Sequence, residues 1–66
     1  MHITINAQAH NIAENSSVAE LIEILALQNK RLAIEVNQEL VPRSLFSSHQ
    51  LHQDDQVEIV HAIGGG

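Results

Sequence analysis

Cysteine is absent from this chain of 66 residues, and Phe46 is its single aromatic residue. Without cysteine the chain can form no disulfide, no zinc–thiolate site and no nucleophilic thiol. One aromatic side chain provides no platform on which nucleic-acid bases could stack. These absences exclude several chemistries before any motif is considered.

Basic residues are also scarce. Three Lys and Arg residues stand against eight Asp and Glu residues, which gives a formal net charge of −5. Nucleic-acid binding depends on clustered Lys and Arg side chains that neutralise phosphates, so we expect no nucleic-acid partner. An acidic surface favours solubility, and it would speed the encounter with a basic protein partner.

Long apolar runs are missing as well. The longest, residues 21–27, is interrupted by Glu23 and is shorter than the roughly 20 residues that span a bilayer. Residues 1–6 carry neither the basic region nor the apolar run of a signal peptide. We therefore expect no membrane association, and we expect a cytoplasmic location, with which the lack of disulfides is compatible.

The hydrophobic pattern predicts one helix. Ser17 and Glu20 have the spacing of a capping box, in which each side chain bonds the other residue's backbone N–H. The apolar stripe at helical spacing consists of Val18, Leu21, Ile22 and Leu25, widened by Ile24 and Leu27. We expect the helix to stop at residues 28–29, with Lys30 and Arg31 near the negative end of its dipole.

Alternating residues predict five strands around this helix. The strands are expected at residues 3–5, 9–13, 32–36, 39–42 and 57–63, with a polar turn at 53–56. One amphipathic helix packed on one mixed sheet buries these faces economically, which gives an α+β class. The β-grasp architecture, in which a sheet wraps around a single helix, fits this order. No linker divides the chain, so we expect one domain over 1–63 and a flexible glycine tail over 64–66.

The side chains offer no convincing active centre. His49 and His52 form the closest histidine pair, but zinc normally needs three or four well-placed ligands, so we predict no metal site. No serine lies in a recognisable nucleophile motif. Asp54 and Asp55 read as turn residues rather than an acid–base couple. We therefore predict no catalytic residue and no cofactor bound by the chain itself.

The remaining reactive group is the terminal carboxylate of Gly66. Gly64, Gly65 and Gly66 directly follow the last predicted strand, and residues without a Cβ can pass through a narrow channel of another protein. A frayed terminus or an added flexible linker is the alternative. A free carboxylate is a poor electrophile, so it would need activation, for example as a mixed anhydride with AMP. A sulfur donor could then displace AMP and leave a thiocarboxylate.

Two segments carry a resemblance to a known family. They are Val-Asn-Gln-Glu-Leu-Val-Pro-Arg at 36–43 and Asp-Gln-Val-Glu-Ile-Val-His-Ala-Ile-Gly-Gly-Gly at 55–66. Over its whole length the chain resembles the ThiS-type sulfur carriers of thiamine biosynthesis, which are small ubiquitin-like β-grasp proteins. That family usually has glycine where this chain has Asp54. Aspartate tolerates the left-handed backbone region better than most residues, so we expect the turn to survive.

The resemblance implies a carrier that is a co-substrate rather than an enzyme. A ThiF-type enzyme would adenylate Gly66 with ATP, a sulfur-transfer system would supply sulfur, and a ThiG-type thiazole synthase would receive it. Gly64 and Gly65 would lie in the partner's channel. Val60 and Ala62 are candidates for the docking surface, and burial of both beneath neighbouring elements is the alternative.

Three other functions stay open at this point. The first is a molybdopterin-synthase small subunit of the same fold and tail chemistry. The second is a ubiquitin-like protein modifier joined through Gly66 to lysines. The third is a plain interaction domain whose glycine tail has no role.

Overall fold

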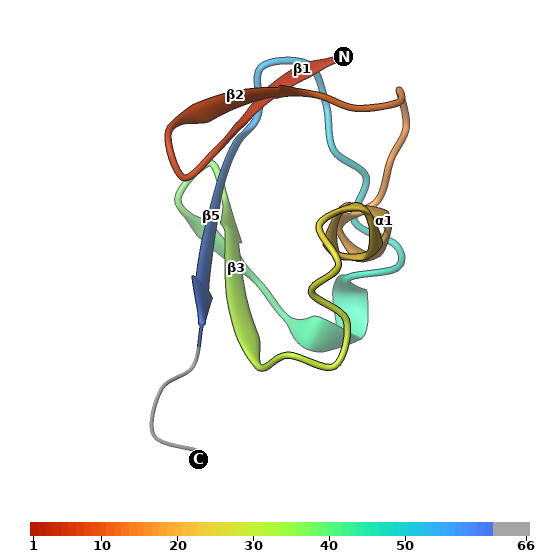
Figure 1. The fold of residues 1–66 in the computed structure, drawn as a ribbon, viewed down its shortest axis with the longest axis vertical. Helices are drawn as coiled ribbons and strands as arrows, with labels where there is room; N and C mark the ends of the chain where they lie inside the picture. Colours follow the sequence, from red (N-terminus) through yellow and green to blue (C-terminus); the bar gives the residue numbers. More distant parts are fainter. Residues whose placement is uncertain (62–66) are drawn as a thin grey trace.

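A computed structural model describes residues 1–61 of the chain, so the expected tail over 64–66 lies outside the described residues. The elements, drawn in Figure 1, are β1 (His2–Ile5), β2 (Gln8–Asn11), α1 (Val18–Ile24), β3 (Leu32–Val36), β4 (Glu39–Val41), the short 3-10 helix η1 (Arg43–Leu45) and β5 (Gln56–His61). Their order agrees with the order predicted from the hydrophobic pattern.

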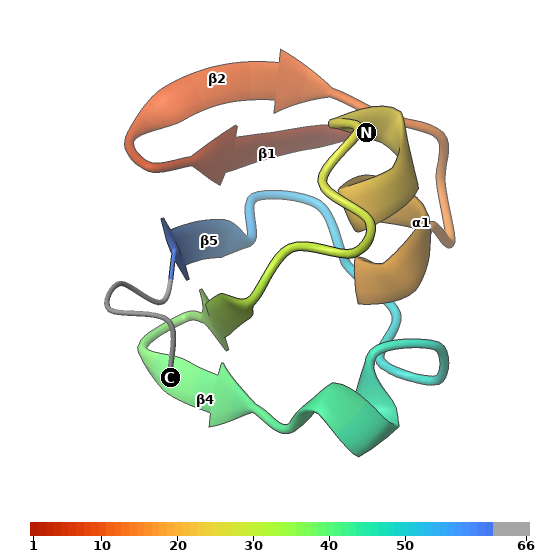
Figure 2. The same cartoon turned by 60° about the horizontal axis from the view of Figure 1, so that its bottom comes forward.

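The five strands form one mixed sheet in the order β2-β1-β5-β3-β4. Strands β1 and β5 pair in parallel near the middle, and the other neighbours pair antiparallel. Figure 2 shows the strands following one another around α1, which lies on one side of the sheet. The α+β class and the β-grasp architecture are therefore confirmed.

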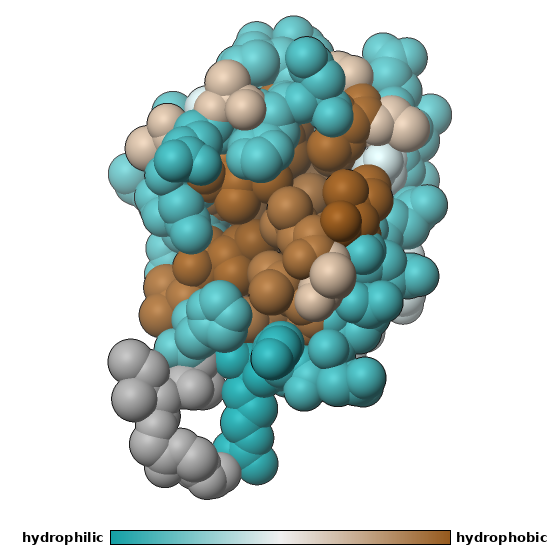
Figure 3. Space-filling view, viewed as in Figure 1, coloured by the Kyte–Doolittle hydropathy of each residue, from teal (hydrophilic) through white to brown (hydrophobic). Residues whose placement is uncertain are grey.

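The core lies between the sheet and α1. Its buried apolar residues are Ile3, Ile5, Val18, Leu21, Ile22, Ile34, Val36, Val41, Phe46, Leu51, Val57 and Ile59. The sheet contributes alternate residues, because successive side chains of a strand point to opposite faces. Figure 3 shows that some apolar surface is still visible between the sheet and the helix. Phe46, directly after η1, is buried in this core, whereas the preceding Leu45 is exposed.

The start of α1 agrees with the predicted capping box. The Glu20 N–H donates to Ser17 Oγ at 3.1 Å, and the Ser17 N–H donates to Glu20 Oε1 at 2.9 Å. The Val18 and Ala19 N–H groups donate to carbonyl oxygens of the segment after η1, those of His49 and Phe46. The N–H groups that a helix start leaves without partners are thus satisfied, and the helix is tied to residues 46–49.

The end of α1 differs from the prediction. The helix stops at Ile24 rather than at residues 28–29, because Ala26 turns into the left-handed region with φ 57°. The Leu27 N–H then donates to the Ile22 carbonyl at 2.9 Å, and the Ala26 N–H donates to the Glu23 carbonyl at 3.0 Å. This pair of bonds is a Schellman motif. No residue of this segment predicts the motif, because its left-handed position is usually occupied by glycine and here holds Ala26.

Two further expectations need correction. The last turn of α1 contains no basic residue, so Lys30 and Arg31 lie beyond the helix end and do not complement its dipole there. Strand β2 covers Gln8–Asn11 rather than 9–13, since its partner β1 begins at His2, which pairs with Asn11.

The Schellman motif leads to the first prediction. Replacing Ala26 with glycine should stabilise the protein by about 0.5–1 kcal/mol, because an alanine in the left-handed region costs roughly 1–2 kcal/mol and the greater freedom of unfolded glycine offsets part of the gain. Urea unfolding followed by circular dichroism measures the change. The control Ala19→Gly, inside α1, should destabilise by about 1 kcal/mol. An Ala26→Gly variant less stable than the original chain would contradict the assignment.

Candidate functional site

Strand β5 is the last described element before the glycine tail in the sequence, and it lies inside the sheet between β1 and β3. Its pairing with β3 extends from Val36 opposite Val57 to Leu32 opposite His61. In Figure 1 the strand runs away from the N-terminus and ends at the opposite end of the molecule. His61 is the last described residue, and the predicted site residues Ala62, Gly64, Gly65 and Gly66 lie outside the described residues.

On the β1 side, Asn6 extends the pairing of β5. Strand β1 pairs with β5 at two positions only, and it ends at Ile5. The Asn6 backbone N–H donates to the Val57 carbonyl at 2.9 Å. The Asn6 side chain accepts from the Ile59 N–H at 2.8 Å and donates to the Ile59 carbonyl at 3.2 Å. One amide side chain therefore replaces the ladder bonds that a longer β1 would supply.

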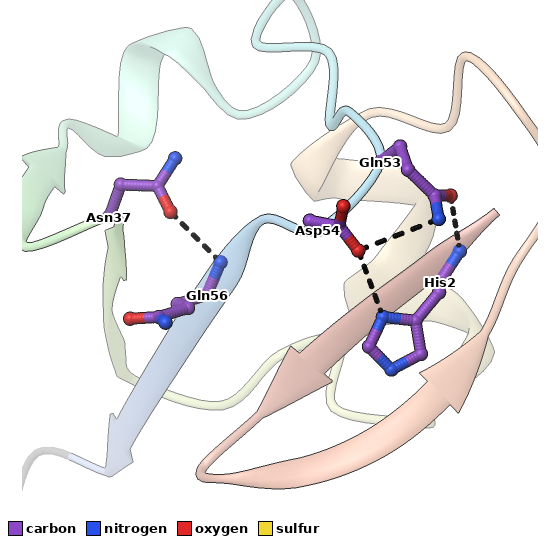
Figure 4. Close-up of polar contacts among 5 residues, drawn as sticks. All are labelled: His2, Asn37, Gln53, Asp54 and Gln56. Carbon is purple, nitrogen blue, oxygen red and sulfur yellow. Dashed lines mark hydrogen bonds and ion pairs between the residues drawn. The ribbon is translucent and has the colours of Figure 1, made fainter.

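On the β3 side, Asn37 holds the beginning of β5 in a similar way. Its backbone N–H donates to the Gln56 carbonyl at 2.8 Å, and its Oδ1 accepts from the Gln56 N–H at 2.9 Å, as Figure 4 shows for the second bond. Its Nδ2 also donates to Asp55 Oδ1 at 3.0 Å. Asn6 and Asn37 each occupy the first position of a two-residue hairpin turn with positive φ, at 49° and 51°.

The turn before β5 uses both aspartates structurally. Asp54 has φ 70°, the left-handed conformation expected where the family usually has glycine. Its carboxylate lies 3.3 Å from Nδ1 of His2, a contact drawn in Figure 4. Asp55 is buried and accepts from the His52 N–H at 2.8 Å. The interpretation of Asp54 and Asp55 as turn residues is therefore confirmed.

Alternation along β5 settles the orientation of its side chains. Val57 and Ile59 are buried against the helix side, whereas Glu58 and Val60 point to the outer face. Val60 is 59% exposed, so it is available for contact and the alternative of burial is wrong for this residue. His61 is exposed.

Other candidate groups of the sequence lie apart or have structural partners. Ser16 and Ser17 are buried, and Ser16 Oγ donates to the Ala13 carbonyl at 2.7 Å. Within residues 1–61, no three His, Asp or Glu side chains come together as a metal-binding group. Over the same residues, no helix has the length and apolar character needed to cross a membrane.

We call the side-chain hydrogen bonds from Asn6 and Asn37 to β5 and the turn before it the asparagine clamps. These bonds were not predicted from the sequence. Asn at the first position of a two-residue hairpin is a recognised turn signal, so the turns at 6–7 and 37–38 could be expected. The signal does not say where the amide side chain points, because that depends on which strand lies beside the turn.

Comparisons with known proteins agree on one family. The model of the ThiS family matches residues 3–66. The chain is 35% identical over 66 residues to the sulfur carrier protein ThiS of Escherichia coli, with 100% of both chains covered. It is also 35% identical to a thiazole synthase of Magnetococcus marinus, of which it spans 20%. A crystal structure of ThiS from Geobacter metallireducens matches with a TM-score of 0.87 and 30% identity over 100% of both chains.

The Asn6 clamp leads to the second prediction. Asn6→Gly keeps the positive φ without steric cost but removes two side-chain bonds to Ile59, so it should destabilise by about 1–2 kcal/mol. Urea unfolding gives the stability, and hydrogen exchange should show faster exchange of the Ile59 amide. Asn11→Gly, on the exposed β2 strand, controls for the introduction of glycine, and the Ile59 amide should keep its protection there. Unchanged protection of Ile59 in Asn6→Gly would show that the clamp contributes nothing.

Proposed function

The chain belongs to the ThiS family, and we propose that it is a sulfur carrier protein of thiamine biosynthesis whose Gly66 carboxylate is the group that carries sulfur. The similarity to the E. coli protein over the whole of both chains supports this assignment. It also favours thiamine biosynthesis over molybdopterin synthesis or protein modification. The chain is a carrier rather than an enzyme, and ATP is consumed by the partner that activates it.

The observation that carries the proposal is that β5 is followed in the sequence, after two residues, by three glycines. Strand β5 is held on both edges by β1, β3 and the asparagine clamps. Residues 62–66 can span at most about 18 Å even when fully extended. An active site that reaches Gly66 must therefore lie close to the end of β5, and its protein must contact the folded domain.

The proposed chemistry has two steps. An oxygen of the Gly66 carboxylate attacks the α-phosphorus of ATP, pyrophosphate leaves, and an acyl adenylate forms. A donor that supplies sulfur at the oxidation level of hydrosulfide then attacks the acyl carbon, the bond to AMP breaks, and a thiocarboxylate remains. The chain itself contributes a terminal residue without a Cβ, so the acyl carbon is open to approach.

Three partners follow from this scheme: a ThiF-type adenylating enzyme, a sulfur-transfer protein and a ThiG-type thiazole synthase. The thiazole synthase has independent support, because a segment similar to this chain forms 20% of a Magnetococcus marinus protein of that name. Two functions in one polypeptide commonly act in succession, so we infer that the present chain delivers its sulfur to a thiazole synthase.

ATP–pyrophosphate exchange provides the third prediction. With a ThiF-type enzyme of the same organism, the full chain should stimulate exchange between ATP and pyrophosphate. With a chain that lacks Gly65 and Gly66, exchange should stay at background, because the terminal carboxylate no longer reaches the nucleotide. Urea unfolding of the truncated chain should be unchanged, since the core lies within residues 3–59.

A matched control keeps all three glycines and changes only the position of the terminal carboxylate. Two extra glycines after Gly66 displace the carboxylate and should also suppress exchange without altering stability. Exchange that persists in the truncated chain would show that the terminal carboxylate is not the activated group, and the proposed function would be wrong.

A further inference from the structure

Strand β2 forms one free edge of the sheet. It comes first in the strand order β2-β1-β5-β3-β4, so within residues 1–61 its single neighbour is β1. Figure 2 shows β2 at the top of the view, with no other described segment beyond it. An edge strand presents N–H and C=O groups to which another strand can pair. The backbone of β2 is therefore open to a further strand.

The pairing with β1 shows which residues of β2 direct their backbone groups outward. The Ile12 N–H donates to the Met1 carbonyl at 3.0 Å, and the Met1 ammonium donates to the Ile12 carbonyl at 2.6 Å, so these two residues form a hydrogen-bonded pair. Hydrogen-bonded and non-hydrogen-bonded pairs alternate along antiparallel strands. In the register of β1 and β2, Ala9 and Asn11 therefore direct their N–H and C=O groups away from the sheet.

The sequence protects the opposite edge of the sheet but not this one. Edge strands are commonly kept from pairing by charged side chains or by proline. Strand β4 begins with Glu39, and Pro42 follows it directly. Residues 7–13 contain no Asp, Glu, Lys, Arg, Pro or Gly, although the whole chain has a net charge of −5. Two equally acidic copies can therefore approach at β2 without bringing like charges of the two strands together.

We propose that β2 pairs antiparallel with β2 of a second copy across a two-fold axis, which joins the two five-stranded sheets into one. A second copy fits because the edge is self-complementary: Ala9 exchanges both backbone bonds with Asn11 of the second copy, and Asn11 does so with Ala9. This register uses only strand residues. An axis at Ala9 would require Ala7, which has φ 69°, and an axis at Asn11 would require Ala13, which lies beyond β2.

The two-fold axis then passes between the His10 residues of the two copies. They form a non-hydrogen-bonded pair, in which the Cα atoms lie about 4.5 Å apart. His10 is half-buried and pairs with Ile3 of β1, so its side chain lies on the helix side of the sheet. The close approach of the same residue from both copies is the specific geometric consequence of this register.

The pairing does not rest on the proposed function. Strand β1 separates β2 from β5, so the contact leaves the strand that precedes the glycine tail untouched. Each copy contributes a strand of four residues. Contacts that bury less than about 1,200 Å² are typical of weak and transient complexes, so we expect a dissociation constant of about 0.1–1 mM.

Disulfide cross-linking tests the register in a chain that has no cysteine of its own. His10→Cys places the two thiols on either side of the axis, and a Cα separation of about 4.5 Å lies within the range that a disulfide bridges. Oxidised glutathione accepts the two electrons and two protons released when the disulfide forms. At about 1 mM chain, more than about half should migrate as a covalent dimer in non-reducing electrophoresis.

Gln8→Cys is the matched control for cross-linking. Position 8 lies on the same side of β2 as His10 and is more exposed, so its thiol is at least as accessible to the oxidant. In the proposed register Gln8 faces Ile12 of the second copy, and the two thiols would lie about 13 Å apart, four residues along the strand. Cross-linking of this variant should therefore stay below about a fifth of that of His10→Cys.

Sedimentation equilibrium tests the pairing without cross-linking. Ala9→Pro removes an N–H group that points away from β1, so the dissociation constant should rise at least about tenfold while the β1–β2 pairing stays intact. Leu40→Pro is the matched control. Ala9 and Leu40 are each the second residue of an edge strand after a two-residue turn, at 6–7 and 37–38. The control should change the dissociation constant by less than about twofold.

Stronger cross-linking of His10→Cys than of Gln8→Cys, together with weaker association of Ala9→Pro than of Leu40→Pro, supports the dimer. A chain that stays monomeric at about 1 mM, equal cross-linking of the two cysteine variants, or equal weakening by the two prolines overturns it. If circular dichroism shows that Ala9→Pro is unfolded, the cross-linking result alone decides.

ATP–pyrophosphate exchange keeps this proposal distinct from the proposed function. The folded Ala9→Pro variant should stimulate exchange as the original chain does. Loss of exchange in this variant alone would show that the β2 edge binds the adenylating enzyme rather than a second copy, and the dimer proposal would be wrong. Absence of exchange with the original chain would refute the proposed function and leave the dimer to the cross-linking and sedimentation results.

Discussion

Hydrogen bonding along both edges of β5 is the constraint on which the rest of the structure depends. On one side the strand pairs in parallel with β1 over a short stretch, and on the other side it pairs antiparallel with the whole of β3. Because β1 is short, the Asn6 amide continues the pairing as far as Ile59. This strand buries Val57 and Ile59 and turns Glu58 and Val60 outward, and in the sequence it precedes the glycine-rich end.

The chain does not use glycine at the positive-φ positions of the described domain. All three glycines occupy positions 64–66. Within residues 1–61, eight positions with positive φ are occupied by Asn, Ala, Gln or Asp instead. Asparagine and aspartate tolerate that region and also bond neighbouring backbone groups, as Asn6 and Asn37 do. The described domain thus obtains hydrogen bonds from its turns, whereas the glycines lie in the segment that the proposed function assigns to a partner's active site.

Much of the fold could be predicted from particular residues, and the failures have definite causes. The Ser17–Glu20 capping box and the alternation in β1, β3 and β5 are local patterns, and the structure agrees with them. The early end of α1 depends on Ala26 in a conformation that alanine rarely adopts, so no local signal marks it. The outward direction of Val60 and the role of Asn6 depend on which strands become neighbours, and that follows from the tertiary fold.

The central claim is that Gly66 becomes the sulfur-bearing residue. Tandem mass spectrometry of the C-terminal peptide tests it most directly, after the chain has been produced together with its adenylating and sulfur-transfer partners. The account predicts replacement of one carboxyl oxygen by sulfur, located on Gly66 by the fragment ions, in a chain that has no cysteine to carry sulfur elsewhere. An unmodified Gly66 with every such partner, or sulfur found on another residue, would contradict it.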